Sequence, residues 1–250
     1  MAYRGDPEYG GQPQAENEGP FKYGLSFSER SIRQAFVRKV FMLVTIMLAV
    51  VAIVTALPFM SPGIKSFARG NVALYYSSYG VFLVCYITLV CCESVRRSFP
   101  ANIIITAVFT LATALMTMSI SQQFSIEAVL LALIITTVSC AAIVLFSLQT
   151  KYDLTNCMGA LAIISLFLMI FGIVAIVAAL VFKVYWLQLI YAGVGALLFM
   201  AYLAVDVQLL MGGRKHEISP EDHIFASVQL FLDIVYIFWF ILSIVGYASR

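Results

Sequence analysis

Residues 205–238 read VDVQLLMGGRKHEISPEDHIFASVQLFLDIVYIF and join the end of one apolar segment to the start of another through a short polar connection. Each apolar segment holds one acid, Asp206 in the first and Asp233 in the second. An acid in the centre of a membrane helix costs about 2.5–3.5 kcal/mol on insertion scales. The stretch therefore predicts two antiparallel membrane helices, each carrying a buried aspartate whose burial calls for a functional explanation.

The composition of the whole chain agrees with a membrane protein. Of its 250 residues, 62% are hydrophobic and 11% are charged, whereas a soluble domain carries about 25% charged residues. Such a chain lacks the polar side chains needed to cover a surface in water, so we expect a lipid bilayer around it. The net charge of +2 is too small to indicate a nucleic-acid partner.

The charged residues leave long gaps, and a gap of roughly 20 apolar residues is enough for one membrane span. The sequence predicts an all-α, polytopic membrane protein with seven transmembrane helices. We expect these helices near residues 40–57, 72–92, 102–121, 126–148, 157–181, 186–211 and 224–247.

The N-terminal part divides into two further segments. Residues 1–25, rich in glycine and proline, predict a disordered cytosolic tail. Residues 26–39 predict an amphipathic juxtamembrane helix that starts with the capping-box spacing of Ser26 and Glu29. A plain basic flank of the first span is the alternative interpretation of residues 26–39. The transmembrane domain then occupies residues 40–250.

The orientation follows from the positions of lysine and arginine. Eleven of the fifteen basic residues fall on the N-terminal side of the predicted spans and four on the opposite side. Cytoplasmic loops carry the excess of positive charge, so the N-terminus is expected in the cytosol. Seven spans then place the C-terminus in the lumen.

The two aspartates are predicted to lie at similar depths. Asp206 precedes the helix-ending Gly212 by six residues, or about 9 Å of helix. Asp233 follows Ile224, where the hydrocarbon is expected to begin, by nine residues, or about 14 Å. Because the two helices are adjacent and antiparallel, the carboxyl groups can share a proton. Such a pair suits a pH-responsive gate that closes when neutral and repels, or admits a cation, when ionised.

Other interpretations of the aspartates and of the neighbouring polar residues stay open. Each aspartate can instead bond to a nearby hydroxyl group or pair with Arg96 or Arg97. Glu93 and Gln229 are candidates for a cytosolic polar cluster. Thr110 belongs to a threonine face that either lines a wet path or bonds back to its own helix; the other members are Thr106, Thr113 and Thr117.

These motifs resemble the transmembrane Bax inhibitor motif family, and within it the lifeguard branch, related to the glutamate receptor-associated protein. The resemblance covers roughly residues 26–250. Besides residues 205–238, it rests on FSERSIR (27–33), FVRKV (36–40), CESVRR (92–97) and QTKYD (149–153).

The resemblance implies a fold in which the last helix is wrapped by the other six. It also implies a pH-sensitive calcium leak in an intracellular membrane, the endoplasmic reticulum or the Golgi. Asp206 and Asp233 match the gate and the transient calcium ligands, and Arg96 or Arg97 matches a basic latch on that pair. The family is further linked to calcium homeostasis and to suppression of apoptosis, with cell-death regulatory proteins as partners and no cofactor.

Two other functions compete with the calcium leak. Presenilin-type proteases also carry one aspartate on each of two neighbouring helices, but their second aspartate follows a Gly-x-Gly motif. Here Asp233 follows Phe231 and Leu232, so an enzyme is not expected. The other alternative is a non-conducting membrane regulator of cell-death signalling, which acts through protein partners.

Overall fold

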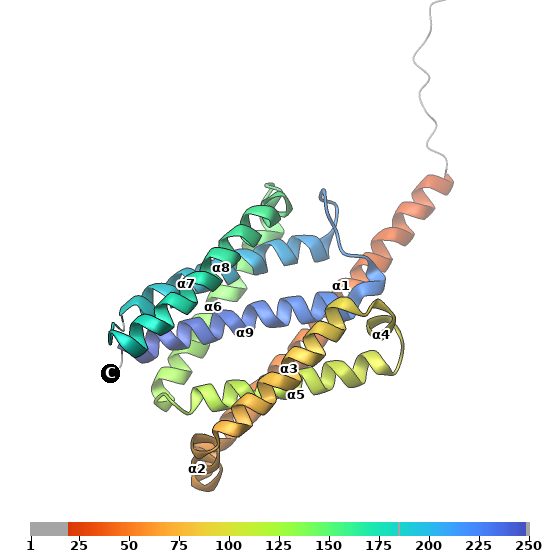
Figure 1. The fold of residues 1–250 in the computed structure, drawn as a ribbon. Helices are drawn as coiled ribbons and strands as arrows, with labels where there is room; N and C mark the ends of the chain where they lie inside the picture. The colour runs from red at the N-terminus through yellow and green to blue at the C-terminus, as the bar shows by residue number, and fades with distance from the viewer. Residues whose placement is uncertain (1–19, 185, 249–250) are drawn as a thin grey trace, which may run out of the picture.

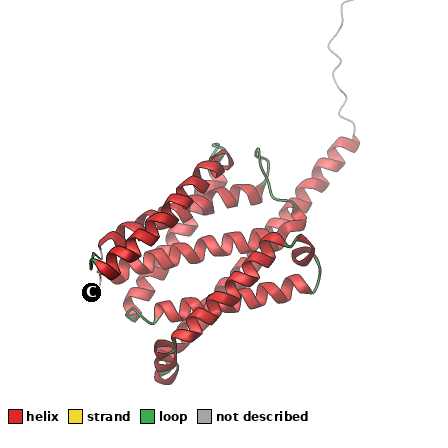
Figure 2. Cartoon of the chain, in the orientation of Figure 1, coloured by secondary structure: helices red, strands yellow, loops and turns green. Residues whose placement is uncertain are grey.

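The computed structural model describes residues 20–184 and 186–248, with side chains from Glu29 onward. Within these parts the chain forms helices joined by loops, without a β-strand (Figure 2). Seven of the described helices are long and apolar enough to cross a membrane, as the sequence predicts. They are α1 (Pro20–Met60), α3 (Val72–Cys91), α5 (Ala101–Ser121), α6 (Ile126–Gln149), α7 (Met158–Val181), α8 (Trp186–Met211) and α9 (His223–Ala248).

Four shorter elements lie in the connections between these spans. Two are short α-helices, and two are 3₁₀ turns that precede α7 and α9. Their bounds are α2 (Pro62–Gly70), α4 (Glu93–Arg97), η1 (Leu154–Cys157) and η2 (Pro220–Asp222).

Local side-chain chemistry sets several ends of the spans. The Asn71 side chain accepts a hydrogen bond from the Leu74 amide at 3.0 Å and so caps α3. The end of α8 is set by glycine. This helix stops where Gly212 and Gly213 adopt φ values of 73° and 74°. A side chain at either position would be strained, so these glycines end the helix as the sequence predicts.

The first helix differs from the expectation. α1 starts at Pro20 and continues without a break to Met60, so Ser26 lies inside the helix and not at its start. Residues 26–39 and the first span are therefore one continuous helix. Of the tail predicted for residues 1–25, residues 1–19 lie outside the described residues, and the remainder belongs to α1.

The last helix, α9, runs through the middle of the bundle (Figure 1). It packs directly on α1, α5, α6 and α8, while α3 packs mainly on α5 and α7 mainly on α8. In the most apolar stretches of α5, α8 and α9, 56% of the residues are buried, against 22–28% in the other four spans. The expected all-α fold, with the last helix inside the other six, is confirmed.

Two apolar clusters meet on α9 and fix its position. One joins α1, α3 and α5 to α9, where the rings of Phe109 and Phe231 meet edge to face with centroids 6.0 Å apart. The other joins α1, α6 and α8 to α9 through side chains such as Leu203 and Ile237. The packing of α8 on α9 brings the two aspartate-bearing helices together.

Candidate functional site

Asp206 and Asp233 meet at the contact between α8 and α9. Their residues are only 8% and 6% exposed, and their carboxyl groups lie close enough to interact directly. A carboxyl group donates a hydrogen bond only when it carries a proton. Two ionised carboxylates this close in apolar surroundings would repel each other, whereas one proton would let either group donate to the other.

The depth of the pair follows from where the two helices end. Asp206 precedes Gly212 by six residues, and Asp233 follows His223 by ten residues, which correspond to about 9 Å and 15 Å of helix. The neighbouring Val205, Val207 and Leu232 are buried apolar side chains. Both carboxyl groups thus lie well inside the bundle in apolar surroundings.

The ion pairs of the described residues lie elsewhere. Neither Asp206 nor Asp233 takes part in an ion pair with a lysine or arginine of residues 29–248. The acids that do so are Glu93, Glu217, Glu221 and Asp222. In this conformation the aspartate pair is uncompensated by positive charge.

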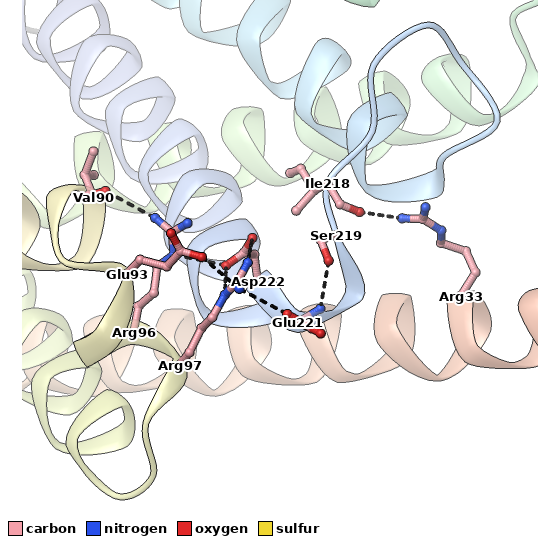
Figure 3. A network of polar contacts seen from close by, with 9 residues as sticks. All are labelled: Arg33, Val90, Glu93, Arg96, Arg97, Ile218, Ser219, Glu221 and Asp222. Carbon is pink, nitrogen blue, oxygen red and sulfur yellow. Dashed lines mark hydrogen bonds and ion pairs between the residues drawn. The ribbon is translucent and has the colours of Figure 1, made fainter.

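Arg96 and Arg97 converge on Asp222, which lies in η2 at the start of the last span (Figure 3). Arg96 Nε donates to Asp222 Oδ1 at 3.0 Å. Arg97 donates twice, from Nε to Oδ1 at 3.0 Å and from Nη2 to Oδ2 at 2.9 Å. The carboxylate of Asp222 is therefore clamped by two guanidinium groups, one of them bidentate.

The two arginines have different surroundings. The Arg96 guanidinium lies over the Phe225 ring at 5.2 Å from its centroid and also donates to the Val90 carbonyl at 3.2 Å. The more exposed Arg97 forms further ion pairs with Glu93 at 2.8 Å and Glu221 at 3.1 Å. The hydrogen bond with Asp222 raises the pKa of Arg97, so it stays charged.

This placement differs from the expected latch on the aspartate pair. Asp222 precedes Asp233 by eleven residues, or about 16 Å along the helix. The structure brings Asp206 and Asp233 together. Arg96 and Arg97 lie apart from this pair, at the end of the bundle where α9 begins. In the sequence, Asp222 belongs to a pattern that is typical of a helix start. Nothing in that pattern indicates that Arg96 and Arg97 bind to it.

A further arginine holds the connection between α8 and α9. Arg33 of α1 donates to the Ile218 carbonyl at 2.8 Å (Figure 3). It also pairs with Glu217 at 2.8 Å. Arg33 was part of a recognised motif, but sequence reasoning gave it no role. Together with the Asp222 clamp, it ties this connection to both α1 and α4.

The loop between α6 and α7 is tied to the same end of the bundle. Gln208, one helical turn short of the end of α8, accepts from the Leu154 amide at 2.8 Å and donates to the Tyr152 carbonyl at 2.9 Å. In that loop, a hydrogen bond from Thr155 lowers the pKa of Asp153, which also accepts from the Lys215 amide. These contacts fix the helix that carries Asp206.

The remaining predicted polar residues contribute no hydrogen bond or ion pair to the aspartates within the part of the chain that the structure describes. Thr110 donates to the Thr106 carbonyl at 2.7 Å, and the other three threonines of that face also bond back to their own helix. Gln229 is half-buried, one turn before Asp233. Glu93 belongs to the Arg97 cluster.

Comparison with known proteins identifies the family. A family profile described as "Inhibitor of apoptosis-promoting Bax1" matches residues 33–250. Protein lifeguard 3 of Mus musculus is 43% identical over 221 residues, which cover 88% of this chain and 71% of the relative. Protein lifeguard 3 of Homo sapiens is 41% identical over 249 residues, covering 98% and 78%.

A more distant relative extends the same similarity. Protein lifeguard 4 of Mus musculus is 28% identical over 241 residues, which cover 95% of both chains. The matched region includes every membrane span, the two aspartates and the Asp222 clamp. The chain therefore belongs to the Bax inhibitor family, as the resemblance of its motifs implied.

Proposed function

We propose that the protein is a pH-sensitive calcium leak channel of intracellular membranes, gated by Asp206 and Asp233. The observation that carries the proposal is the close approach of two buried carboxyl groups on neighbouring membrane helices. Burying an acid in a membrane is costly, and a proton shared by two acids is a natural switch.

The gate works through the proton on the pair. While one proton is shared, the hydrogen bond joins α8 to α9 and the site is closed. When that proton is lost, two negative charges face each other, and the helices either separate or accept a cation between them. Two carboxyl groups supply fewer than the 6–8 oxygens of a stable calcium site, which suits an ion in passage.

The Asp222 clamp, formed with Arg96 and Arg97, is a second contact that holds the closed state, at the end of the bundle where α9 begins. It ties the connection between α3 and α5 to the start of α9 through Arg96 and Arg97. Movement of α9 away from α8 would have to strain or break these contacts. We assign the two arginines the role of a latch that acts through Asp222, some distance from the aspartates.

The cellular role is carried over from the family. We place the protein in the endoplasmic reticulum or Golgi membrane, with the N-terminus in the cytosol and the C-terminus in the lumen. There it regulates calcium and suppresses apoptosis, together with cell-death regulatory proteins. No catalytic step is proposed.

The test is calcium flux through the purified full chain in liposomes, measured across pH. We expect a flux that depends on pH in the wild type and in Glu127→Gln, a control that removes an exposed carboxyl group from α6. Absence of any flux above that of protein-free liposomes would contradict the channel and favour a non-conducting regulator that acts through protein partners.

A further inference from the structure

Cys91 and Cys92 lie side by side at the end of α3, and both are exposed. Cys91 is the last residue of that helix, whereas Cys92 separates it from α4. Neither cysteine belongs to the aspartate pair or to the Asp222 clamp. An exposed thiol beside the end of a membrane helix is the kind of group to which a fatty acyl chain is attached.

The edge of the hydrocarbon lies beside these two cysteines. The 20 residues of α3 include no acid, lysine or arginine. The five residues of α4, which follow directly, include Glu93, Arg96 and Arg97. Because charged side chains avoid the hydrocarbon, α3 leaves the lipid tails where it ends. A thiol at that position meets both the water from which an acyl donor arrives and the lipid that receives the acyl chain.

The face of α3 that carries Cys91 is exposed to lipid. Ile87 precedes Cys91 by four residues and Val84 precedes it by seven, so the three side chains share one face of the helix. Ile87 is 57% exposed and Val84 is 67% exposed. Cys92 differs, because Cys85, seven residues before it, is buried. An acyl chain on Cys91 therefore has a free lipid-facing path along α3, and one on Cys92 does not.

The direction of α3 turns the Cys91 side chain toward the membrane. In an α-helix every Cα–Cβ bond tilts toward the helix N-terminus. Since Cys91 ends α3, this tilt points back along the span, toward Ile87. A third exposed cysteine, Cys157, directly precedes α7 instead. At the start of a span the same tilt points away from the bilayer, and Leu161, four residues further on, is buried.

The acyl donor sets the side of the membrane on which the reaction takes place. A fatty acyl-CoA carries several negative charges, so it does not cross a bilayer unaided and is used in the cytosol. The orientation proposed above puts the end of α3 in the cytosol, together with Arg96 and Arg97. The inference rests on that orientation and is independent of calcium conduction.

We propose that Cys91 is S-acylated by a fatty acyl-CoA in a reaction catalysed by a membrane acyltransferase. The Cys91 thiolate attacks the carbonyl carbon of the acyl thioester. A carbon–sulfur bond to Cys91 forms, and the carbon–sulfur bond to coenzyme A breaks. Coenzyme A leaves as a thiolate and takes up the proton that Cys91 has lost. The attached chain then lies in the lipid along Ile87 and Val84.

The modification anchors the part of the chain that carries the Asp222 clamp. Arg96 donates to the carbonyl of Val90, the residue before Cys91, at 3.2 Å and to Asp222 at 3.0 Å. An acyl chain fixed in the leaflet holds this junction of α3 and α4 at the membrane boundary. Because S-acylation is reversible, the anchor is one that the cell can add and remove.

The test uses the full chain expressed in mammalian cells that are fed a palmitate analogue carrying an alkyne. We expect the wild type to be labelled, and neutral hydroxylamine, which cleaves thioesters, to remove the label. Cys91→Ser should lose the label. Cys92→Ser and Cys157→Ser, which remove exposed thiols without the lipid-facing path, should be labelled like the wild type. Cys91 is exposed, so Cys91→Ser should unfold in detergent at the wild-type temperature.

Mass spectrometry of the labelled wild-type protein locates the acyl group without relying on any variant. We expect fragment ions that place it on Cys91. An acyl group on Cys92 or Cys157, or a label that Cys91→Ser retains, would overturn the assignment. Absence of label from a protein whose N-terminal tag is cytosolic would contradict the acylation and leave the proposed orientation standing. Absence of label together with a lumenal N-terminal tag would refute the orientation and the acylation with it.

Discussion

The carboxyl groups of Asp206 and Asp233 lie close together, so removing either acid changes the environment of the other. Asp206→Asn and Asp233→Asn keep the shape of the side chain and remove one titratable group. We expect either substitution to flatten the pH dependence of calcium flux through liposomes. The double variant should add little, because the two acids act as one coupled unit.

The control for these variants is their stability. Asparagine retains hydrogen-bonding capacity, so we expect each variant to fold, which is checked by its unfolding temperature in detergent. A full pH response in both single variants, at normal stability, would show that the sensor lies elsewhere. His216, in the connection between α8 and α9, and His223, the first residue of α9, would then be the next candidates.

The Asp222 clamp gives a second prediction. Asp222→Asn removes the charge that binds two guanidinium groups, and Arg96→Ala/Arg97→Ala removes the guanidinium groups themselves. Both variants should raise the resting calcium leak by about fivefold or more, since a hydrogen bond to a charged group contributes about 1.5–3 kcal/mol.

The exposed Arg38 supplies the matched control, because Arg38→Ala removes a positive charge on α1 that is not one of the ion-pair partners of Asp222. Its leak should equal that of the wild type. If Asp222→Asn leaks no more than Arg38→Ala at equal protein content, the clamp does not hold the closed state.

Sequence reasoning found the aspartates and missed the clamp for a physical reason. An acid inside a long apolar segment is visible in the sequence because its burial is costly. The partner of Asp222 depends on how the α3–α5 connection folds over the start of α9, which no local pattern encodes. The same is true of Arg33, whose partners lie in a loop far along the chain.

At the scale of helices, the contact of α8 with α9 depends on a glycine. A Cβ atom at Gly195 would lie 2.5 Å from Cζ of Phe240, and that ring is itself packed against Tyr191 and Phe199. Gly195→Ala should therefore cost about 1–3 kcal/mol by overpacking. For a chain of this size the unfolding temperature falls by about 2–4 °C per kcal/mol.

Gly193 lies on the same helix and provides the control. A Cβ atom there would have no neighbour within 4 Å, and alanine favours the helix over glycine. Gly193→Ala should leave the unfolding temperature unchanged or raise it slightly. Equal unfolding temperatures for the two variants would mean that α8 and α9 do not approach as closely as described.

The long helices were predictable and the short ones were not. Gaps between charges mark the spans, because a membrane excludes charge over about 20 residues. The helices α2 and α4 have nine and five residues, too few for a periodic pattern. The early start of α1 was missed because its first residues lack an apolar stripe.

Across six of the seven spans polarity follows burial, and α3 is the exception, with the lowest mean hydropathy, 1.6, and only 22% of its most apolar stretch buried. The spans α5, α8 and α9 are more buried and less apolar than the lipid-facing α1, α6 and α7. Polar groups are tolerated where other helices satisfy them, and lipid-facing surfaces must be apolar. This rule explains why the aspartates lie inside, but the central place of α9 came from the family resemblance, because several arrangements of seven helices obey the rule.

The orientation of the bundle is the last prediction. Seven spans place the two ends of the chain on opposite sides, and the excess of basic residues on the N-terminal side puts that side in the cytosol. The clamps made by Arg33 and by Arg96 with Arg97 then lie at the cytosolic mouth, with their basic residues contributing to the excess. In sealed microsomes, protease should remove a tag at residue 1 and spare a tag after Arg250, whereas both should be lost once detergent opens the membrane. Protection of both tags, or of neither, would mean that one apolar helix does not cross. Protection of the N-terminal tag alone would reverse the topology and place the clamps in the lumen.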